Sequence, residues 1–385
     1  MFALVESDGG RSRTVGILRW LVALGAIVGM PAFVHAAENR SDFKMAVVGL
    51  AHAHAWPHLR SIAQRTDLRL VGVADESEVL RSEAAKEAPR ATLYSDYTKL
   101  LEEEKPDAVW SFVESDRHVE ITQACARKGV HLIFEKPMAS TLDQARRMAD
   151  LVKKHGILLM INYQMAWWPA NSTAYEIAKS GQLGRVWRVH GIIGHGGPGP
   201  RGPEDHRRQA FWAWLNDESR GGGALMDFTS YGAVWLRWYL GMPSSVYAVT
   251  THTRPETYNT NTNATVLAAF PDNRVGIIEG SWDLPRAFQD VEVFGSRGSV
   301  SMNRTTVEMY IGRDKKEVSV GQLDPVNSDP VSYLMYAVRA RKPIEGIVGA
   351  DFNVDVMEIV EAARLSAASG KPVELPARRR GELEP

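Results

Sequence analysis

Apolar segments alternate with amphipathic segments along the chain from residue 43 to about residue 155. The apolar segments have the composition of strands buried on both faces of a sheet, and the segments between them carry apolar residues at helical spacing. Strands that alternate with helices indicate βαβ units, and right-handed crossovers then favour a doubly wound, Rossmann-type parallel sheet. The expected strands are 43–49, 68–74, 92–94, 107–113 and 129–135, and the expected helices are 55–64, 79–88, 96–104, 116–128 and 142–155.

From residue 161 the pattern changes to segments in which apolar and polar residues alternate. Such alternation predicts strands with one covered and one exposed face. An α/β protein follows, with a Rossmann domain at residues 43–160 and an α+β domain with a large open, mostly antiparallel sheet at residues 161–375. An open sheet of this kind leaves one face to be covered, which suggests a homo-oligomer, a dimer or tetramer, formed through that face. The expected strands are 185–193, 245–253, 262–270, 274–282, 289–294 and 305–311, and the expected helices are 169–180, 225–240, 330–340 and 354–368.

The first 36 residues have the pattern of a secretory signal peptide. Arginines precede an uncharged apolar run, residues 20–34, and small residues follow at Ala36 and Ala37. The run is short for a membrane span, and a cleavage site after Ala36 fits the pattern. We therefore expect an exported, periplasmic protein. The alternatives are an uncleaved anchor, or a cytoplasmic protein whose start codon is misassigned.

Composition and charge exclude several classes of partner. The chain has 385 residues, 44% of them hydrophobic, and its formal net charge is −1, which is typical of a globular protein with two domains. That charge gives no reason to expect nucleic acid or an anionic membrane surface as a partner, and we expect no stable membrane span. The single cysteine, Cys125, excludes an internal disulfide and a metal site built from cysteines.

The strand at 129–135 ends in a charged pair, Glu135 and Lys136, which Pro137 follows. Open α/β sheets bind their ligands at the carboxyl ends of parallel strands. The proline prevents the strand from continuing and fixes the backbone direction after the lysine. Taken alone, a Lys-Pro at a strand end is an ordinary surface feature, and the surrounding residues are what make it the expected centre of a site.

The turn after the first strand, from Gly49 to His54, takes the position at which the pyrophosphate of a dinucleotide binds. The motif G-x-G-x-x-G appears here as G-L-A-H-A-H, so only the first glycine remains. Ala51 still lets the backbone come near a phosphate, and the start of the next helix offers free N–H groups. Asp75 has the spacing of the acid that binds an adenosine ribose. Glu76 follows with no arginine beside it, which favours NAD over NADP.

Three histidines in this turn and the next helix, His52, His54 and His58, make a shared metal site conceivable. No carboxylate or cysteine lies in the same turn, and a metal would compete with the dinucleotide. We therefore expect no metal and place these imidazoles at the mouth of the cofactor cleft.

Two motifs together resemble the glucose–fructose oxidoreductase, inositol dehydrogenase and rhizopine-catabolism (Gfo/Idh/MocA) family. The first is the series D-A-V, H-x-E and E-K-P between residues 107 and 137, and the second is G-G-G-A-L-M-D-F-T-S-Y at residues 221–231. The resemblance covers roughly residues 44–375, and the occurrence of both motifs at this separation is specific.

The resemblance implies an NAD(P)-dependent oxidoreductase acting on CH–OH groups, with Lys136 as the active-site lysine near the nicotinamide and the reacting carbon. It implies that Glu135 places the nicotinamide ribose and that Asp227 contacts the substrate or orients the acid–base group. Tyr231 stands where inositol dehydrogenases carry histidine, which is similar to glucose–fructose oxidoreductase, xylose dehydrogenase and dihydrodiol dehydrogenase. The peptide bond before Pro137 is expected to be cis.

We expect Lys136 and Tyr231 to share the acid–base chemistry while Asp227 orients them. A partly desolvated lysine near the positive nicotinamide should have a lowered pKa, and the pKa of a tyrosine beside that ammonium should fall as well. The alternative is that Asp227 is only a helix-start acid and Tyr231 an ordinary core aromatic residue.

Two departures from the family pattern concern the cofactor. Ala51 and His54 replace glycines of the fingerprint. The loop after the fourth strand, which reads Thr-Pro-Asn before the histidine in the family, reads V-E-S-D-R-H at residues 113–118. Ser115 and His118 are the expected cofactor contacts there, and the two acids of this loop add negative charge near the nicotinamide.

Residues of the second half are candidates for binding the substrate. Tryptophans can stack on sugar rings, although core packing explains at least half of the eleven tryptophans equally well. A histidine in a Gly/Pro-rich loop and a glutamine after the last Rossmann strand are further candidates, whereas Arg201, Arg207 and Arg208 are interpreted as a solvated loop face. The expected contacts are Trp167, His195 and Trp212 for the substrate and Gln164 for the substrate or the nicotinamide amide.

Three functions compete at this point. The first is an exported NAD(P)-dependent oxidoreductase that transfers hydride between nicotinamide and a hydroxyl of a sugar or polyol. Its NAD would stay tightly bound, because free cofactor is not supplied outside the cytoplasm. The second is a redox-neutral, NAD-dependent enzyme that cleaves glycosides through a transient keto-sugar. The third is a non-catalytic binding protein on the same fold.

Overall fold

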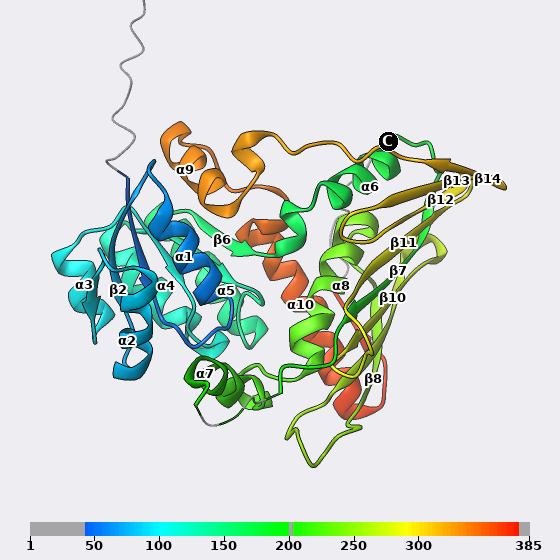
Figure 1. The fold of residues 1–385 in the computed structure, drawn as a ribbon. Coiled ribbons are helices and arrows are strands. Elements are labelled where there is room, and N and C mark those ends of the chain that lie inside the picture. The colour runs from blue at the N-terminus through cyan, green and yellow to red at the C-terminus, as the bar shows by residue number, and fades with distance from the viewer. Residues whose placement is uncertain (1–42, 200–201, 203, 377–385) are drawn as a thin grey trace, which may run out of the picture. The chain divides into compact units, whose positions relative to one another are not determined.

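The computed structural model describes residues 43–199, 202 and 204–376. Two sheets organise this part of the chain, one parallel and one mostly antiparallel, as expected for the α/β class (Figure 1). The expected signal peptide, residues 1–36, lies outside the described residues. Within the described residues, no helix is both long enough and apolar enough to span a bilayer.

The first sheet has six parallel strands in the order β3-β2-β1-β4-β5-β6, which is the doubly wound arrangement that the sequence predicts. Its inner strands read as continuous apolar runs because helices cover both faces. The strands are β1 Lys44–Val48, β2 Arg69–Ala74, β3 Thr92–Tyr94, β4 Ala108–Ser111, β5 His131–Glu135 and β6 Leu159–Asn162; the helices are α1 Ala55–Gln64, α2 Glu78–Glu87, α3 Tyr97–Glu103, α4 His118–Lys128 and α5 Leu142–His155.

Gly49 shows why the first glycine of the turn is retained. Its backbone is left-handed, with φ of 81°. A Cβ placed there would lie 2.4 Å from Cγ1 of Val113 and 2.6 Å from its backbone nitrogen, because the chain leaving β1 crosses close to the end of β4. Only glycine meets both requirements.

The second sheet has nine strands in the order β14-β13-β12-β11-β7-β10-β9-β8-β15. Its pairs are antiparallel except for β7 and β10, which run parallel. Helices α8 and α10 cover one face, between the two sheets (Figure 1). The strands are β7 Val186–Gly194, β8 Ser245–Thr251, β9 Asn263–Phe270, β10 Arg274–Ser281, β11 Phe288–Gly295, β12 Gly298–Met302, β13 Val307–Ile311, β14 Asp314–Glu317 and β15 Val373–Glu374; the helices are α6 Pro169–Lys179, α7 His206–Leu215, α8 Ala224–Leu240, α9 Pro330–Ala340 and α10 Ala350–Ser369.

Several elements differ from the sequence-based expectation. The parallel sheet continues through β6, which pairs with β5 as far as Asn162 and so runs two residues past the expected boundary at 160. The strands β12, β14 and β15 and the helix α7 were not expected. The residues of β14 are all exposed and β15 has only two residues, so neither carries a pattern of alternation.

Helix α8 carries the second motif to the carboxyl edge of the parallel sheet. It begins after three glycines, of which Gly222 has no room for a side chain, since a Cβ there would lie 2.1 Å from the carbonyl oxygen of Leu215 at the end of α7. Asp227 lies in the first turn of α8, where the positive end of the helix dipole favours an acid.

Candidate active site

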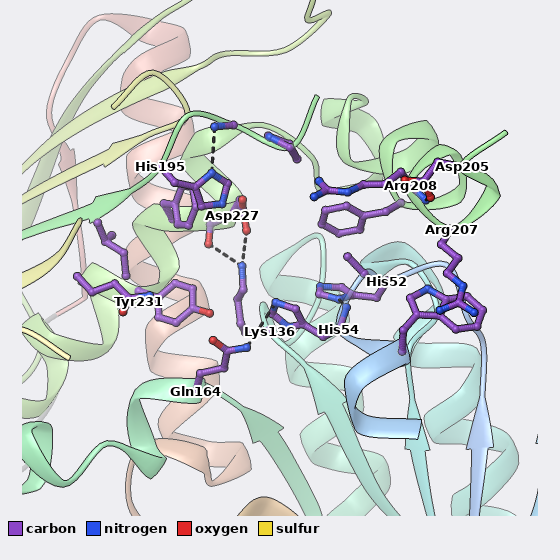
Figure 2. Close-up of a pocket in the computed structure, with 18 residues that line it drawn as sticks. His52, His54, Lys136, Gln164, His195, Asp205, Arg207, Arg208, Asp227 and Tyr231 are labelled. Atoms are coloured by element: carbon purple, nitrogen blue, oxygen red, sulfur yellow. Dashed lines mark hydrogen bonds and ion pairs between the residues drawn. The ribbon is translucent and has the colours of Figure 1, made fainter. Parts of the chain in front are cut away.

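A cavity of about 650 Å³ lies where the turn after β1, the end of β5, helix α7 and the start of α8 meet (Figure 2). This is the carboxyl edge of the parallel sheet, at the point where the strand order reverses between β1 and β4. Its charged and polar lining residues are His52, His54, Lys136, Gln164, His195, Asp205, Arg207, Arg208, Asp227, Tyr231 and Gln289.

Lys136 and Asp227 form a buried ion pair across the two halves of the molecule. The Lys136 ammonium donates to the Asp227 carboxylate and, at 3.0 Å, to the Asp227 carbonyl oxygen. Trp282 donates from Nε1 to the other carboxylate oxygen at 2.9 Å. Burial would raise the pKa of Asp227, but the ammonium and the indole N–H outweigh it and hold that pKa below its usual value. The peptide bond between Lys136 and Pro137 is cis, as predicted.

Tyr231 lies one helical turn after Asp227, and its ring centroid is 4.8 Å from the Lys136 ammonium. The expectation that its pKa falls is wrong in this structure. Burial raises the pKa of Tyr231 well above its ordinary value, and the carboxylates of Asp227 and Glu135 raise it further. The phenol is therefore a neutral hydrogen-bond donor here.

Glu135 is fully buried at the end of β5 and is held from two sides. Its Oε2 lies 2.8 Å from Nδ1 of His54, and its Oε1 accepts a hydrogen bond from Nδ2 of Asn162 at 2.7 Å. Trp167 in turn donates from Nε1 to Oδ1 of Asn162 at 2.8 Å. Burial alone would raise the pKa of Glu135, but the imidazoles around it, His54 first, lower it to about 2.

His52 is buried beneath helix α7. Its ring lies 5.0 Å from that of Phe211 and 5.9 Å from that of Trp214. Its Nδ1 accepts a hydrogen bond from the backbone N–H of His54 at 3.1 Å. Burial is the main reason that the pKa of His52 is far below its ordinary value, so the ring is neutral.

No carboxylate lies near these histidines along the chain, but the fold supplies one. Glu135 joins His52 and His54 in a group whose possible ligand atoms lie within 4.8 Å of one another. The hydrogen bond of His52 opposes a metal, however. Because Nδ1 of His52 accepts an N–H, the proton of the neutral ring is on Nε2, and a metal ligand needs a bare nitrogen there.

His195 enters the cavity from the loop after β7. Its Nδ1 accepts a hydrogen bond from the backbone N–H of Gly197 at 2.9 Å, and its ring stands edge-on to Phe228 at 5.0 Å. Burial lowers the pKa of His195, which keeps this imidazole neutral.

Helix α7 brings two arginines to the site that the sequence suggested were a solvated loop face. Arg207 pairs with Glu87 at 2.8 Å and Glu83 at 2.9 Å on α2, and its guanidinium lies 4.0 Å from the ring centroid of Trp56. Arg208 lines the cavity and extends from α7 toward His195 (Figure 2). The interpretation of both residues as a solvated loop face is therefore wrong, because they are half-buried on a helix, whereas Arg201 lies outside the described residues.

The expected cofactor contacts lie near the cavity in two groups. Around the turn, the N–H groups of Ala51 and Ala53 donate no hydrogen bond to any described residue, so they are free for an anion. Asp75 closes the same turn by accepting from the N–H of Leu50 at 2.7 Å and of Ser77 at 2.8 Å. These groups fit a dinucleotide that lies across the edge of the sheet.

Ser115 and His118 form the second group, and both are buried and outside the cavity lining that the described residues provide. His118 donates from Nδ1 to the carbonyl oxygen of Met138 at 2.9 Å and stacks on Phe134. Burial lowers its pKa to about 4. Its side chain is thus part of the packing between α4 and β5, which the spacing of the motif does not reveal.

Two of the expected sugar-stacking residues, Trp167 and Trp212, also lie outside that lining. Trp167 orients Asn162, as described above, and Trp212 packs edge-on against Tyr258 at 5.0 Å. The cavity has an aromatic residue that the sequence did not single out for this role, Phe211 of α7. Gln289 of β11 and the Trp282 contact with Asp227 were also missed, because both come from strands distant in sequence.

Two family models match the chain. Residues 43–163 match the oxidoreductase family with an NAD-binding Rossmann fold, and residues 172–301 match the Gfo/Idh/MocA C-terminal domain. The chain belongs to the Gfo/Idh/MocA oxidoreductase family. It is an NAD(P)-dependent oxidoreductase of the kind that acts on CH–OH groups, and its first domain binds the nicotinamide cofactor.

Known relatives cover almost the whole described chain. A D-xylose 1-dehydrogenase (NADP(+)) of Haloferax volcanii is 26% identical over 319 residues, which are 81% of this chain and 94% of that enzyme. The solved structure of an aldose–aldose oxidoreductase from Caulobacter crescentus superposes with a TM-score of 0.73 at 22% identity, over 87% of this chain and 100% of that one. A levoglucosan dehydrogenase in complex with NADH and levoglucosan gives 0.73 at 19% identity, over 87% and 100% of the chains.

Proposed function

We propose that this oxidoreductase transfers hydride between nicotinamide and a hydroxyl-bearing carbon of a sugar or polyol. The observation that carries the proposal is the buried pair of Lys136 and Asp227, which joins the cofactor-binding sheet to the first turn of α8 inside the cavity. The relatives named above are dehydrogenases and an oxidoreductase, which favours net oxidation or reduction over redox-neutral cleavage of glycosides.

In this proposal Lys136 and Tyr231 hold the reacting oxygen. Asp227 fixes the ammonium in place, and the neutral phenol stands beside it, so two donors converge on one region of the cavity. Preorganised donors in a water-poor site stabilise the negative charge that develops on an oxygen as its carbon loses hydride. The nicotinamide would supply the hydride acceptor.

The rest of the lining supports a polyhydroxylated substrate. Gln164, Gln289 and His195 present amide and imidazole groups to the cavity from three different elements. Hydroxyl groups both donate and accept, so they can be satisfied by such a mixed set. Phe211 offers an apolar face on the side of α7.

For the cofactor we propose NAD rather than NADP. No arginine is next to Glu76 in the sequence, but in the structure Nη2 of Arg117 lies 2.8 Å from Oε1 of Glu76, so the expectation of no neighbouring arginine is wrong. That arginine is also paired with Glu120 at 2.7 Å and lies 3.7 Å from Glu114. Its charge is therefore already balanced by carboxylates, and Glu76 would repel a 2′-phosphate.

We further propose that the protein is exported and oligomeric, with a cofactor that stays bound. The arginines and the apolar run before Ala36 support export. The face of the nine-stranded sheet opposite α8 and α10 exposes Tyr247, Val249 and Leu267, which supports a homo-oligomer through that face. N-terminal sequencing of the secreted protein tests export, its mass in solution tests the oligomer, and the nucleotide that co-purifies with it tests the bound cofactor.

The proposed reaction is tested with purified protein, NAD or NADP, and a panel of neutral sugars and polyols. We expect reduced nicotinamide to form with some of them. The variant Lys136→Met keeps the length of the side chain and removes the ammonium, so it should lose turnover while still binding the cofactor. A fully active Lys136→Met, or the absence of reduced nicotinamide with every sugar, contradicts the proposal.

A further inference from the structure

Three imidazoles line the cavity, and the hydrogen bond at Nδ1 fixes the proton position of each one. His52 accepts the N–H of His54 at 3.1 Å, and His195 accepts the N–H of Gly197 at 2.9 Å. An Nδ1 that accepts carries no proton, so the neutral ring carries it on Nε2. His52 and His195 are both kept neutral by burial, and each therefore exposes only an N–H donor toward the cavity.

His54 has the opposite arrangement. Its Nδ1 faces the carboxylate of Glu135 at 2.8 Å, and an ionised carboxylate can only accept. In the neutral ring, Nδ1 of His54 therefore carries the proton, and Nε2 has a free lone pair. That nitrogen lies 3.5 Å from Nε2 of Gln164, whose amide can donate to it. Of the imidazoles that the described residues bring to this cavity, His54 alone offers an acceptor.

The carboxylate behind His54 is built to stay in place and to stay charged. It is 1% exposed, and Asn162 holds its second oxygen at 2.7 Å. Asn162 is itself held by Trp167 at 2.8 Å. A buried carboxylate on Nδ1 both selects the tautomer of a histidine and stabilises the imidazolium that forms when Nε2 takes a proton.

The groups expected from the sequence are less suited to accept a proton in this structure. The Lys136 ammonium already donates to the carboxylate and the carbonyl oxygen of Asp227. The phenol of Tyr231 is a neutral donor. A sugar hydroxyl in the cavity would meet donors at these two residues and an acceptor at His54.

We propose that His54, oriented by Glu135, is the catalytic base that takes the hydroxyl proton during oxidation; this inference rests on the proposed function. In the step, the O–H bond breaks and its proton passes to Nε2 of His54. The carbon–hydrogen bond would break with its electron pair as the carbon–oxygen double bond forms, and a bound oxidised nicotinamide would accept that pair as hydride. The side chain of His54 is 30% exposed, so the proton can then pass to solvent.

The test compares His54→Gln with a matched control, His190→Gln. His190 is an imidazole on β7 whose Nε2 lies 2.7 Å from the carboxylate of Glu279, and neither residue lines the cavity. We expect His54→Gln to lower kcat by about 10²- to 10⁴-fold, the range for loss of a general base, with the Kd of NAD unchanged. His190→Gln should keep kcat within a few-fold of wild type.

A second variant, His54→Ala, leaves room for an added imidazole. We expect free imidazole to restore part of its kcat in a saturable way, and to have no such effect on Lys136→Met. If the wild type is active and both His54 variants keep its kcat, or lose only affinity for NAD, this inference is overturned and the proposed function stands. A wild type that reduces no nicotinamide with any sugar overturns the proposed function and this inference with it.

Discussion

Replacing Asp227 by asparagine tests whether the ion pair with Lys136 holds the site together. The side chains of Lys136 and Asp227 are 5% and 11% exposed, so the change leaves a buried ammonium without its counter-charge. Breaking a buried pair in this way costs about 3–5 kcal/mol. The ammonium keeps its hydrogen bond to the carbonyl oxygen of residue 227, but the single asparagine oxygen must then serve both Lys136 and Trp282, so we expect a loss of at least about 3 kcal/mol.

The assay is urea unfolding of wild type, Asp227→Asn, Lys136→Met and the double variant at neutral pH. A loss of about 3 kcal/mol is roughly a hundredfold change in the unfolding equilibrium. The double variant removes both charges, and we expect its unfolding free energy to return to within about 1 kcal/mol of wild type while its activity stays lost. Additive losses in the double variant would refute the ion pair as the cause.

The pH dependence gives an independent check with a defined sign. The pKa of Asp227 is depressed in the folded protein, so its ionised carboxylate contributes to the free energy of unfolding. That contribution is fully present above the unfolded pKa of about 3.9 and is lost as the pH falls through the lower folded pKa. Asp227→Asn lacks this pH-dependent contribution to the free energy of unfolding. The stability difference between wild type and Asp227→Asn should therefore narrow on acidification below about pH 4 and stay constant above it. A difference that grows on acidification would contradict the assignment.

Three further changes probe the cofactor cleft. Glu76→Ser removes one of the three carboxylates around Arg117 and with it a repulsive charge, so kcat/KM with NADP should rise about fivefold, the equivalent of about 1 kcal/mol, and steady-state assays with both cofactors would detect it. Gly49→Ala forces a left-handed alanine against Val113, and urea unfolding should show a loss above about 2 kcal/mol, with weaker NAD binding. Arg207→Gln removes two ion pairs between α7 and α2, so NADH should dissociate faster in stopped-flow fluorescence; an unchanged rate would mean that α7 does not retain the cofactor.

The elements of the first domain could be predicted from the sequence because their signals are local. Helix α1 begins and ends at the expected residues, as does β3, since apolar periodicity and turn residues lie within the segments themselves. The contact between Lys136 and Asp227 could also be anticipated, because each residue belongs to one of the two family motifs. The strands β14 and β15 escaped because edge strands this short or this exposed carry no alternation.

The contacts that decide the chemistry could not be predicted from the sequence, because they join residues far apart in the chain. Glu135 reaches His54 across 81 positions, and Trp282 reaches Asp227 across 55. The turn containing His54 has no acid of its own, so the sequence argued against any carboxylate partner there. The same limitation affected Arg117, which meets Glu76 only because the segments after β2 and β4 come together at the carboxyl edge of the parallel sheet.

The proton positions on the three cavity histidines depend on local contacts at His52 and His195 and on a contact with a distant residue at His54. His52 and His195 each accept an N–H from the residue two positions later, so a local turn makes both of them donors toward the cavity. His54 depends instead on a carboxylate delivered by a different strand. A neutral glutamine at 135 could donate to Nδ1 and return the proton to Nε2, which would make all three histidines donors. Glu135→Gln should therefore lower kcat even though the imidazole of His54 remains in place. If Glu135 served only to bind the ribose, the substitution would instead change the affinity for the cofactor.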